Sequence, residues 1–181
     1  MDIFQRLENS HSKENIASII DYVGKDKNRF RALMDCFFMV TKDYRVPQRA
    51  AHTVALIFDQ KPELIRPYVP EFIGLMLLPE TRNSIKRNIL RILQHCEIEE
   101  KFSGRLYSRL FEILSDPNEE IAVRAFSITV LYHISEEHKG LKPELKSLIE
   151  MVLAEPECSQ GVRSRAVKAL QKLEKELACE N

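Results

Sequence analysis

The apolar residues of the chain recur at helical spacing, in pairs of stripes separated by short polar turns. The clearest pair runs from Leu110 to Leu131, where two amphipathic segments flank a Ser-Asp-Pro turn. The spacing predicts that Asp116 caps the second helix, that Pro117 lies in its first turn, and that Glu119 completes a capping box. Each segment has a single apolar stripe and cannot bury it alone. The pair is therefore predicted to be one repeat of a helical solenoid.

The second segment of each pair begins on Val or Ile at a regular interval. These residues are Val46, Ile85, Ile121 and Val162, which follow one another at steps of 39, 36 and 41 residues. The positions four, seven and eight residues later are mostly small or apolar, and at 100° per residue they fall on one side of a helix. Four segments in phase at a step near 40 residues indicate an internal repeat.

The elements predicted from this pattern are all helical. Ser10 or Ser12 is expected to cap an early helix that Gly24 ends, and Pro67 and Pro70 are expected to break a later one, because each removes a backbone donor. The fold class is predicted to be all-α, an α-α superhelix of about four helix pairs plus an N-terminal helical cap, with roughly nine helices and no strand. The predicted single domain spans 1–181, with the cap at 1–27 and the repeats at 28–60, 62–97, 99–138 and 141–178.

Two stretches resemble a known repeat family. The turn Leu114-Ser-Asp-Pro with Ile121 and Ala125, and the start Gly161-Val-Arg-Ser-Arg-Ala166, are similar to HEAT repeats of the armadillo-like α-solenoid class. The resemblance covers about 28–177 and implies a right-handed superhelix with the second helices on its concave wall. In this alignment the Arg that follows Val in the family is present at Arg163 only, and other residues take its place in the other three repeats. The family pattern specifies fold more than function.

The predicted concave stripe carries the candidate binding residues. If the repeated Val and Ile side chains point inward, positions two, six and nine residues later point the opposite way. That stripe is moderately basic, and further Arg residues flank it. The candidate partner-binding residues are Arg49, His52, Arg87, Arg91, Arg124, Ser127, Arg165 and Lys168. One interpretation is a groove for an acidic peptide, a helix or a phosphate-bearing chain. The other is a solvated face whose Arg side chains pair with acids in adjacent repeats.

Composition narrows the function. The chain has 27 Lys and Arg against 27 Asp and Glu, with 44% hydrophobic and 30% charged residues. A neutral chain lacks the global field of a dedicated nucleic-acid binder. The charged start shows no secretory signal, and the longest apolar stretch, Phe72 to Pro79, is too short to span a bilayer. The four cysteines form no C-x-x-C pair, which favours free thiols in a reducing cytoplasm. We therefore expect a cytoplasmic protein that does not cross a membrane; the sequence does not indicate its oligomeric state.

No pattern typical of an enzyme occurs in the sequence. His133 and His138 are five residues apart, about 140° around a helix, whereas zinc ligands on a helix lie three or four apart. The five glycines stand alone, without a phosphate loop or nucleophile elbow. We expect no metal and no cofactor, and we expect a non-catalytic scaffold that binds a protein or an acidic peptide on its concave face.

Three alternatives come from other classes of protein. A nucleic-acid-binding protein resembling the HEAT-like DNA glycosylases would need an acid and aromatic residues on the concave face, and the predicted stripe has neither. A helical lyase of the fumarase and adenylosuccinate lyase superfamily would need a signature loop that is absent. Nothing in the sequence is specific to a HEAT-type bilin lyase.

Overall fold

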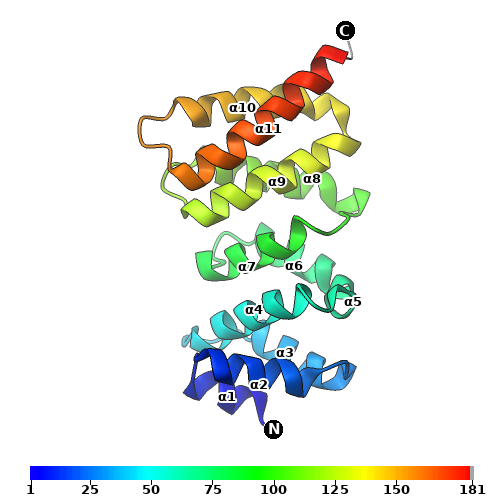
Figure 1. The fold of residues 1–181 in the computed structure, drawn as a ribbon, viewed down its shortest axis with the longest axis vertical. Coiled ribbons are helices and arrows are strands. Elements are labelled where there is room, and N and C mark those ends of the chain that lie inside the picture. Colours follow the sequence, from blue (N-terminus) through cyan, green and yellow to red (C-terminus); the bar gives the residue numbers. More distant parts are fainter. Residues whose placement is uncertain (180–181) are drawn as a thin grey trace. The chain divides into compact units, whose positions relative to one another are not determined.

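The computed structural model describes residues 1–179, and these fold into helices α1 to α11 with two short 3-10 turns and no strand (Figure 1). The predicted all-α class is confirmed. The last two residues of the predicted domain, 180 and 181, lie outside the described part. The described chain divides into two compact units, one formed by Met1–Phe72 and the other by the residues from Ile73 onward. The division falls within α6, and so inside the predicted second repeat.

The first unit begins with the predicted helical cap. Its first four helices are α1 (Ile3–Asn9), α2 (Lys13–Val23), α3 (Lys27–Phe37) and α4 (Arg45–Phe58). The Ser12 hydroxyl accepts the backbone N–H of Asn15 at 3.1 Å, and Gly24 ends α2 at a φ of 53°. Both were predicted from the sequence. Helix α3 ends at Phe37, and the Val40 side chain beyond it is 97% exposed.

Prolines interrupt the following segment as predicted. The chain forms α5 (Pro62–Ile65), then a 3-10 turn (Arg66–Tyr68), then α6 (Val69–Leu77). Pro67 and Pro70 have no N–H to donate, so a continuous ladder of i to i−4 hydrogen bonds cannot run through this segment.

The second unit consists of two layers of helices. It contains α7 (Asn83–Leu93), α8 (Glu100–Ser115), α9 (Ile121–Glu137), α10 (Lys142–Ala154) and α11 (Gln160–Cys179). The second helices of successive repeats are α7, α9 and α11, and α9 packs between the other two. Helices α8 and α10 form the other layer (Figure 1). Helix α8 packs against α9, and α10 packs against α11.

The register of α9 differs from the predicted one by two residues. Ile121 is the first residue of α9 and is 55% exposed, whereas Val123 is fully buried. The inward residues of the four second helices are therefore Val46, Ile85, Val123 and Val162, at steps of 39, 38 and 39 residues. The repeat is more regular than the sequence alignment indicated.

The predicted capping box before α9 was wrong for the same reason. The Asp116 carboxylate accepts the backbone N–H of Asn118 at 2.9 Å, so it closes an Asx turn three residues before the helix. Glu120 occupies the N-cap position and makes no capping hydrogen bond through its side chain. The Asp-Pro-Asn sequence therefore forms a turn, and α9 begins later than the sequence predicts.

Shifting the register places a cation directly after the inward residue in all three second helices of this unit. Lys86 lies 2.7 Å from the Glu119 carboxylate, which belongs to the turn of the next repeat. Arg124 pairs with Glu155 of the following turn at 2.6 Å, and it also donates two hydrogen bonds to the Leu114 carbonyl at the end of α8. These bonds satisfy a carbonyl that has no partner inside its own helix. We call this set of contacts the cation ladder.

The same position in the last repeat is Arg163, which donates to the Leu153 carbonyl at the end of α10 at 3.4 Å. The separation of ten residues equals that between Arg124 and Leu114. In the register predicted from the sequence, the family's Arg is present at Arg163 alone, with Lys86 and Ala122 at the equivalent positions of α7 and α9. The structure corrects the position in α9, where Arg124 and not Ala122 is the equivalent residue.

The conformation of Gly24 gives the first prediction. A φ of 53° with a ψ of −120° strains any residue that has a Cβ. Gly24→Ala is expected to destabilise the protein by about 1–3 kcal/mol. Gly104 lies inside α8, and a Cβ there would meet nothing within 4 Å. Gly104→Ala should therefore stabilise by about 0.5–1 kcal/mol. Urea unfolding of both variants measures these two changes in the free energy of unfolding, which should have opposite signs. A change of the same sign in both variants would contradict the interpretation that backbone strain at Gly24 distinguishes the two glycines.

The cation ladder gives the second prediction. The Lys86 side chain is 7% exposed and its partner Glu119 is 10% exposed. Glu119→Ala would leave a buried ammonium without a carboxylate, and should destabilise by about 3–5 kcal/mol. Glu112 forms a matched surface pair with Arg109 and is 68% exposed. Glu112→Ala should change the unfolding free energy by about 0–1 kcal/mol. Equal losses in the two variants, measured by chemical denaturation, would show that burial does not govern these pairs.

Candidate binding groove

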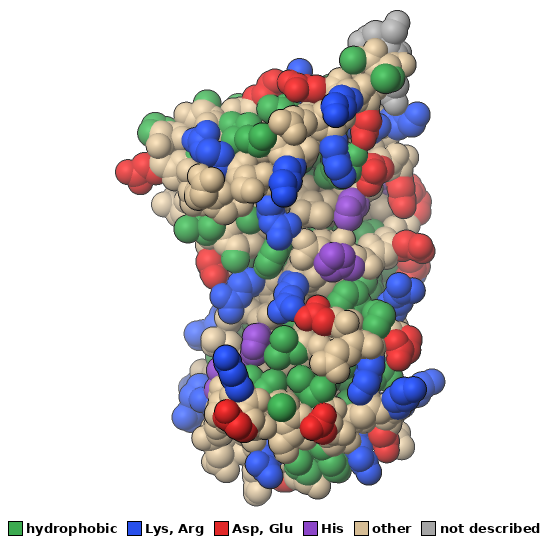
Figure 2. All heavy atoms as spheres, viewed as in Figure 1, with side chains coloured by type: hydrophobic (Ala, Val, Ile, Leu, Met, Phe, Trp, Pro, Cys, Tyr) green, Lys and Arg blue, Asp and Glu red, His purple; other side chains and the backbone are tan. Residues whose placement is uncertain are grey.

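Four of the eight candidate residues lie on accessible positions of the second helices in the second unit. Arg87 and Arg91 are half-buried on α7, and Arg87 pairs with Glu120 at 3.4 Å. On α11, Arg165 is half-buried and Lys168 is exposed. Figure 2 shows Lys and Arg side chains gathered over α11 on this face.

Two candidate residues are not on an open face. Arg124 is 5% exposed and belongs to the cation ladder, and Ser127 is fully buried, with its hydroxyl donated to the Val123 carbonyl at 2.9 Å. The physical reason is the register of α9, which turns both positions toward the interior between α9 and its neighbours. Thr129, predicted to point inward, instead lies at the surface between α9 and α11.

The remaining two candidates belong to the first unit. Arg49 donates through Nη1 to the carbonyls of Leu7 and Glu8 at 2.6 and 2.8 Å, so it caps the C-terminal end of α1. His52 is half-buried, and its ring lies edge-on to the ring of His11 with centroids 5.4 Å apart. The Arg49 side chain is therefore committed to holding α1 against α4.

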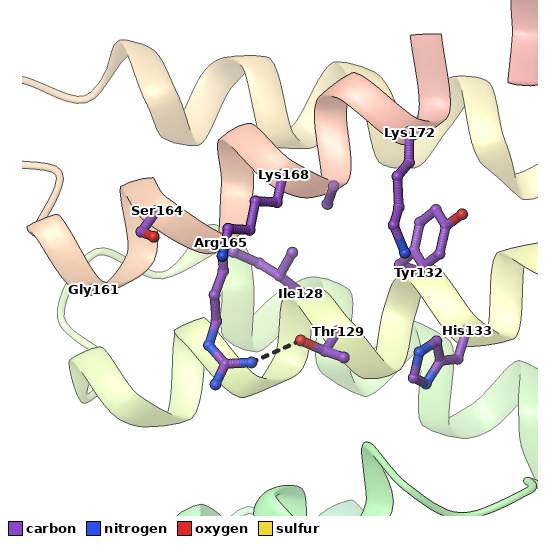
Figure 3. Close-up of a pocket in the computed structure, with 10 residues that line it drawn as sticks. Ile128, Thr129, Tyr132, His133, Gly161, Ser164, Arg165, Lys168 and Lys172 are labelled. Carbon is purple, nitrogen blue, oxygen red and sulfur yellow. Dashed lines mark hydrogen bonds between the residues drawn. The ribbon is translucent and has the colours of Figure 1, made fainter. Parts of the chain in front are cut away.

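A groove of about 540 Å³ opens between α9 and α11 (Figure 3). Seven of the ten residues that line it are Thr129, Tyr132 and His133 from α9, and Ser164, Arg165, Lys168 and Lys172 from α11. None of the ten lining residues is an acid. Three cations within eight residues of one helix face thus share a concave surface that contains no carboxylate.

The Arg165 side chain reaches from α11 toward α9, and the groups that it contacts are neutral. Its Nη1 donates to the Thr129 hydroxyl at 2.9 Å (Figure 3). The same atom donates to the Gln94 side-chain carbonyl at 3.0 Å, and the guanidinium lies 4.7 Å from the centre of the Phe126 ring. Among the described residues, no carboxylate lies within ion-pair distance of Arg165. Burial lowers the pKa of Arg165, the direction expected for a cation desolvated without an opposite charge.

The far end of the groove is built around Tyr132. The Lys172 ammonium lies 4.7 Å from the centre of the Tyr132 ring, a cation–π contact. The Tyr132 hydroxyl donates to Glu176, which also pairs with the buried Lys142 at 3.0 Å. Burial, reinforced by the bond to Glu176, raises the pKa of Tyr132, so this phenol stays neutral. Glu176 therefore offsets part of the Lys172 charge, whereas Arg165 and Lys168 have no such acid.

Comparison with known proteins identifies the repeat. A model of the HEAT repeat domain matches residues 3–173. The chain belongs to the HEAT repeat family. Its fold is therefore an α-solenoid, as the sequence resemblance implied, and the chain is a helical repeat scaffold. The match begins upstream of the stretch that resembles HEAT repeats in the sequence and takes in the N-terminal helices.

One solved structure agrees with this fold. It is the crystal structure of an engineered protein from the Northeast Structural Genomics Consortium, which aligns with 96% of this chain and 78% of its own at a TM-score of 0.59 and 16% identity. At that identity the likeness concerns the fold alone. A search of curated proteins gives no match.

The described part of the chain shows neither a metal-binding cluster nor a membrane-spanning helix. Within residues 1–179, no group of three or more His, Cys, Asp or Glu side chains is arranged to hold a metal ion. All four cysteines are free thiols. In that same part of the chain, no helix combines the length and the apolar character needed to cross a bilayer.

Several groove residues were missed by the sequence analysis. Phe126, Thr129 and Tyr132 were missed because the predicted register of α9 was wrong by two residues. His133 lies ten residues after Val123, beyond the last position of the predicted stripe. Lys172 was missed because the stripe was continued to the position nine residues after Val162. Lys172 lies one turn beyond Lys168, and the recurrence of cations at 165, 168 and 172 was a signal in the sequence that could have found it.

Proposed function

We propose that this HEAT repeat protein is a non-catalytic scaffold that binds a protein partner on the open face of α7, α9 and α11. The observation that carries the proposal is the groove between α9 and α11, whose cations Arg165 and Lys168 have no acid beside them in the described part of the chain. Uncompensated charge on a concave face supports recognition of an opposite charge. Arg87 and Arg91 extend the basic character of this face along α7.

Nucleic acid is the second candidate, since a basic groove also attracts phosphates. Two features argue against it. The Phe126 and Tyr132 rings are each covered by a cation, so those faces are not open for bases to stack on. The groove also lacks a carboxylate that could act on a nucleotide, as the resemblance to DNA glycosylases would require.

The proposal predicts that charge reversal on this face abolishes partner capture. The intact chain and the variant Arg87→Glu, Arg91→Glu, Lys168→Glu would be used as baits in lysate of the native cell, followed by mass spectrometry. A partner retained by the intact chain should be lost by the variant, because three attractive contacts become repulsive.

The matched control reverses Arg105, Lys139 and Lys175, which are exposed and lie outside the groove. It carries the same change in net charge and should retain the partner. Equal capture by all three baits would overturn the proposed use of this face. Loss of the partner after nuclease treatment would favour the nucleic-acid alternative.

A further inference from the structure

Arg165 has donors that the protein leaves unused. Both of its hydrogen bonds to Thr129 and Gln94 leave from Nη1. Its Nε and Nη2 atoms have no acceptor among the described residues. These two atoms form one edge of the planar guanidinium, which matches the two oxygens of a carboxylate.

The side chain is also held in place. Thr129 and Gln94 fix Nη1, and the Phe126 ring supports the guanidinium from one side. A cation fixed in this way loses little conformational freedom when it binds an anion. By contrast, the buried Arg124 has its carboxylate, Glu155, within the protein. Arg165 is thus a positioned arginine that has no carboxylate partner among residues 1–179.

The spacing of the cations indicates the form of the ligand. Arg165 and Lys168 are three residues apart on α11, so their Cβ atoms are about 5–6 Å apart. In an extended peptide, alternate side chains point the same way and recur about every 6–7 Å. Two acids on alternate residues of an extended segment can therefore meet both cations at once. Ser164 adds a hydroxyl to the same side of the groove.

We propose that the groove between α9 and α11 binds a short extended acidic segment of a partner protein. One carboxylate takes the Nε and Nη2 edge of Arg165, and a second lies at Lys168. This inference rests on the proposed function and makes it specific, because it names the chemistry of the partner. Oligonucleotides are also negatively charged, but the groove offers their bases no open aromatic ring to stack on. Oligonucleotide binding is therefore the competing outcome of the test.

The test measures peptide binding by fluorescence anisotropy at low salt. The probe is a fluorescent peptide with Glu on alternate residues of a Gly-Ser background, and the matched probe has Gln in place of each Glu. The full-length protein should bind the Glu peptide saturably and the Gln peptide at least about tenfold more weakly, and added salt should weaken binding further. A ten-residue thymidine oligonucleotide is the third probe.

Variants separate the positioned edge from general charge. Arg165→Met should weaken the Glu peptide about tenfold or more, because a charge-assisted bidentate contact is lost. Arg165→Lys keeps the charge without the fork and should recover only part of that loss. Arg105→Met, on the exposed surface of α8, should bind as the unchanged protein does. Thermal unfolding of each variant shows whether it is folded, and if Arg165→Met unfolds, the comparison rests on Arg165→Lys.

Three outcomes would overturn the inference: equal binding of the Glu and Gln peptides, full affinity in Arg165→Lys, or tighter binding of the oligonucleotide than of the Glu peptide. The two proposals fail separately. If partner capture depends on the basic face but the acidic peptide does not bind, the inference alone fails. If reversing the charges on that face does not change partner capture, the proposed function fails.

Discussion

Burial of α9 between α7 and α11 is the constraint from which the rest of the second unit follows. Helix α9 is buried from Val123 to Ser135 on several sides at once, because α7 and α11 flank it and α8 lies behind it. It has no single polar face, and its stability depends on the helices before and after it, as in any repeat array. The ends of the first helices are enclosed in the same packing, and their last carbonyls lose contact with water.

The cation ladder is the consequence of that enclosure. Buried carbonyls need donors, and Arg124 supplies two to Leu114 while Glu155 balances its charge. In the repeat of α7 two residues make these contacts, because a lysine ammonium cannot reach both a carboxylate and a helix-end carbonyl as a guanidinium does. Lys86 takes the carboxylate of Glu119, and Arg109 of α8 donates to the Met76 carbonyl, which lies ten residues before Lys86. The repeat thus preserves the contacts while varying the residues that make them.

The sequence predicted the class of fold and most element types, because these depend on local signals. Ser12, Gly24 and the two prolines act within a few residues of themselves, and each was interpreted correctly. The register of α9 could not be obtained locally. Asp116 and Pro117 are suited to a helix start, and only packing of the next turn against Lys86 shows that Glu119 belongs to an ion pair instead. An error of two residues there was enough to place Arg124 and Ser127 on an open face and to miss Phe126, Thr129 and Tyr132.

Arg124 and Arg165 differ in whether a carboxylate of the described chain balances their charge. Arg124 and Arg165 were predicted as equivalent members of one stripe, and both are removed from water to some degree. Arg124 meets a carboxylate of its own chain, so its charge is balanced and no ligand is required. Arg165 meets a hydroxyl, an amide and a ring, which orient a cation without neutralising it. Since a desolvated charge is stabilised chiefly by an opposite charge, the two sites differ in the carboxylate that Arg165 lacks among the described residues. The acidic partner that we propose would supply in α11 the pairing that α9 makes internally.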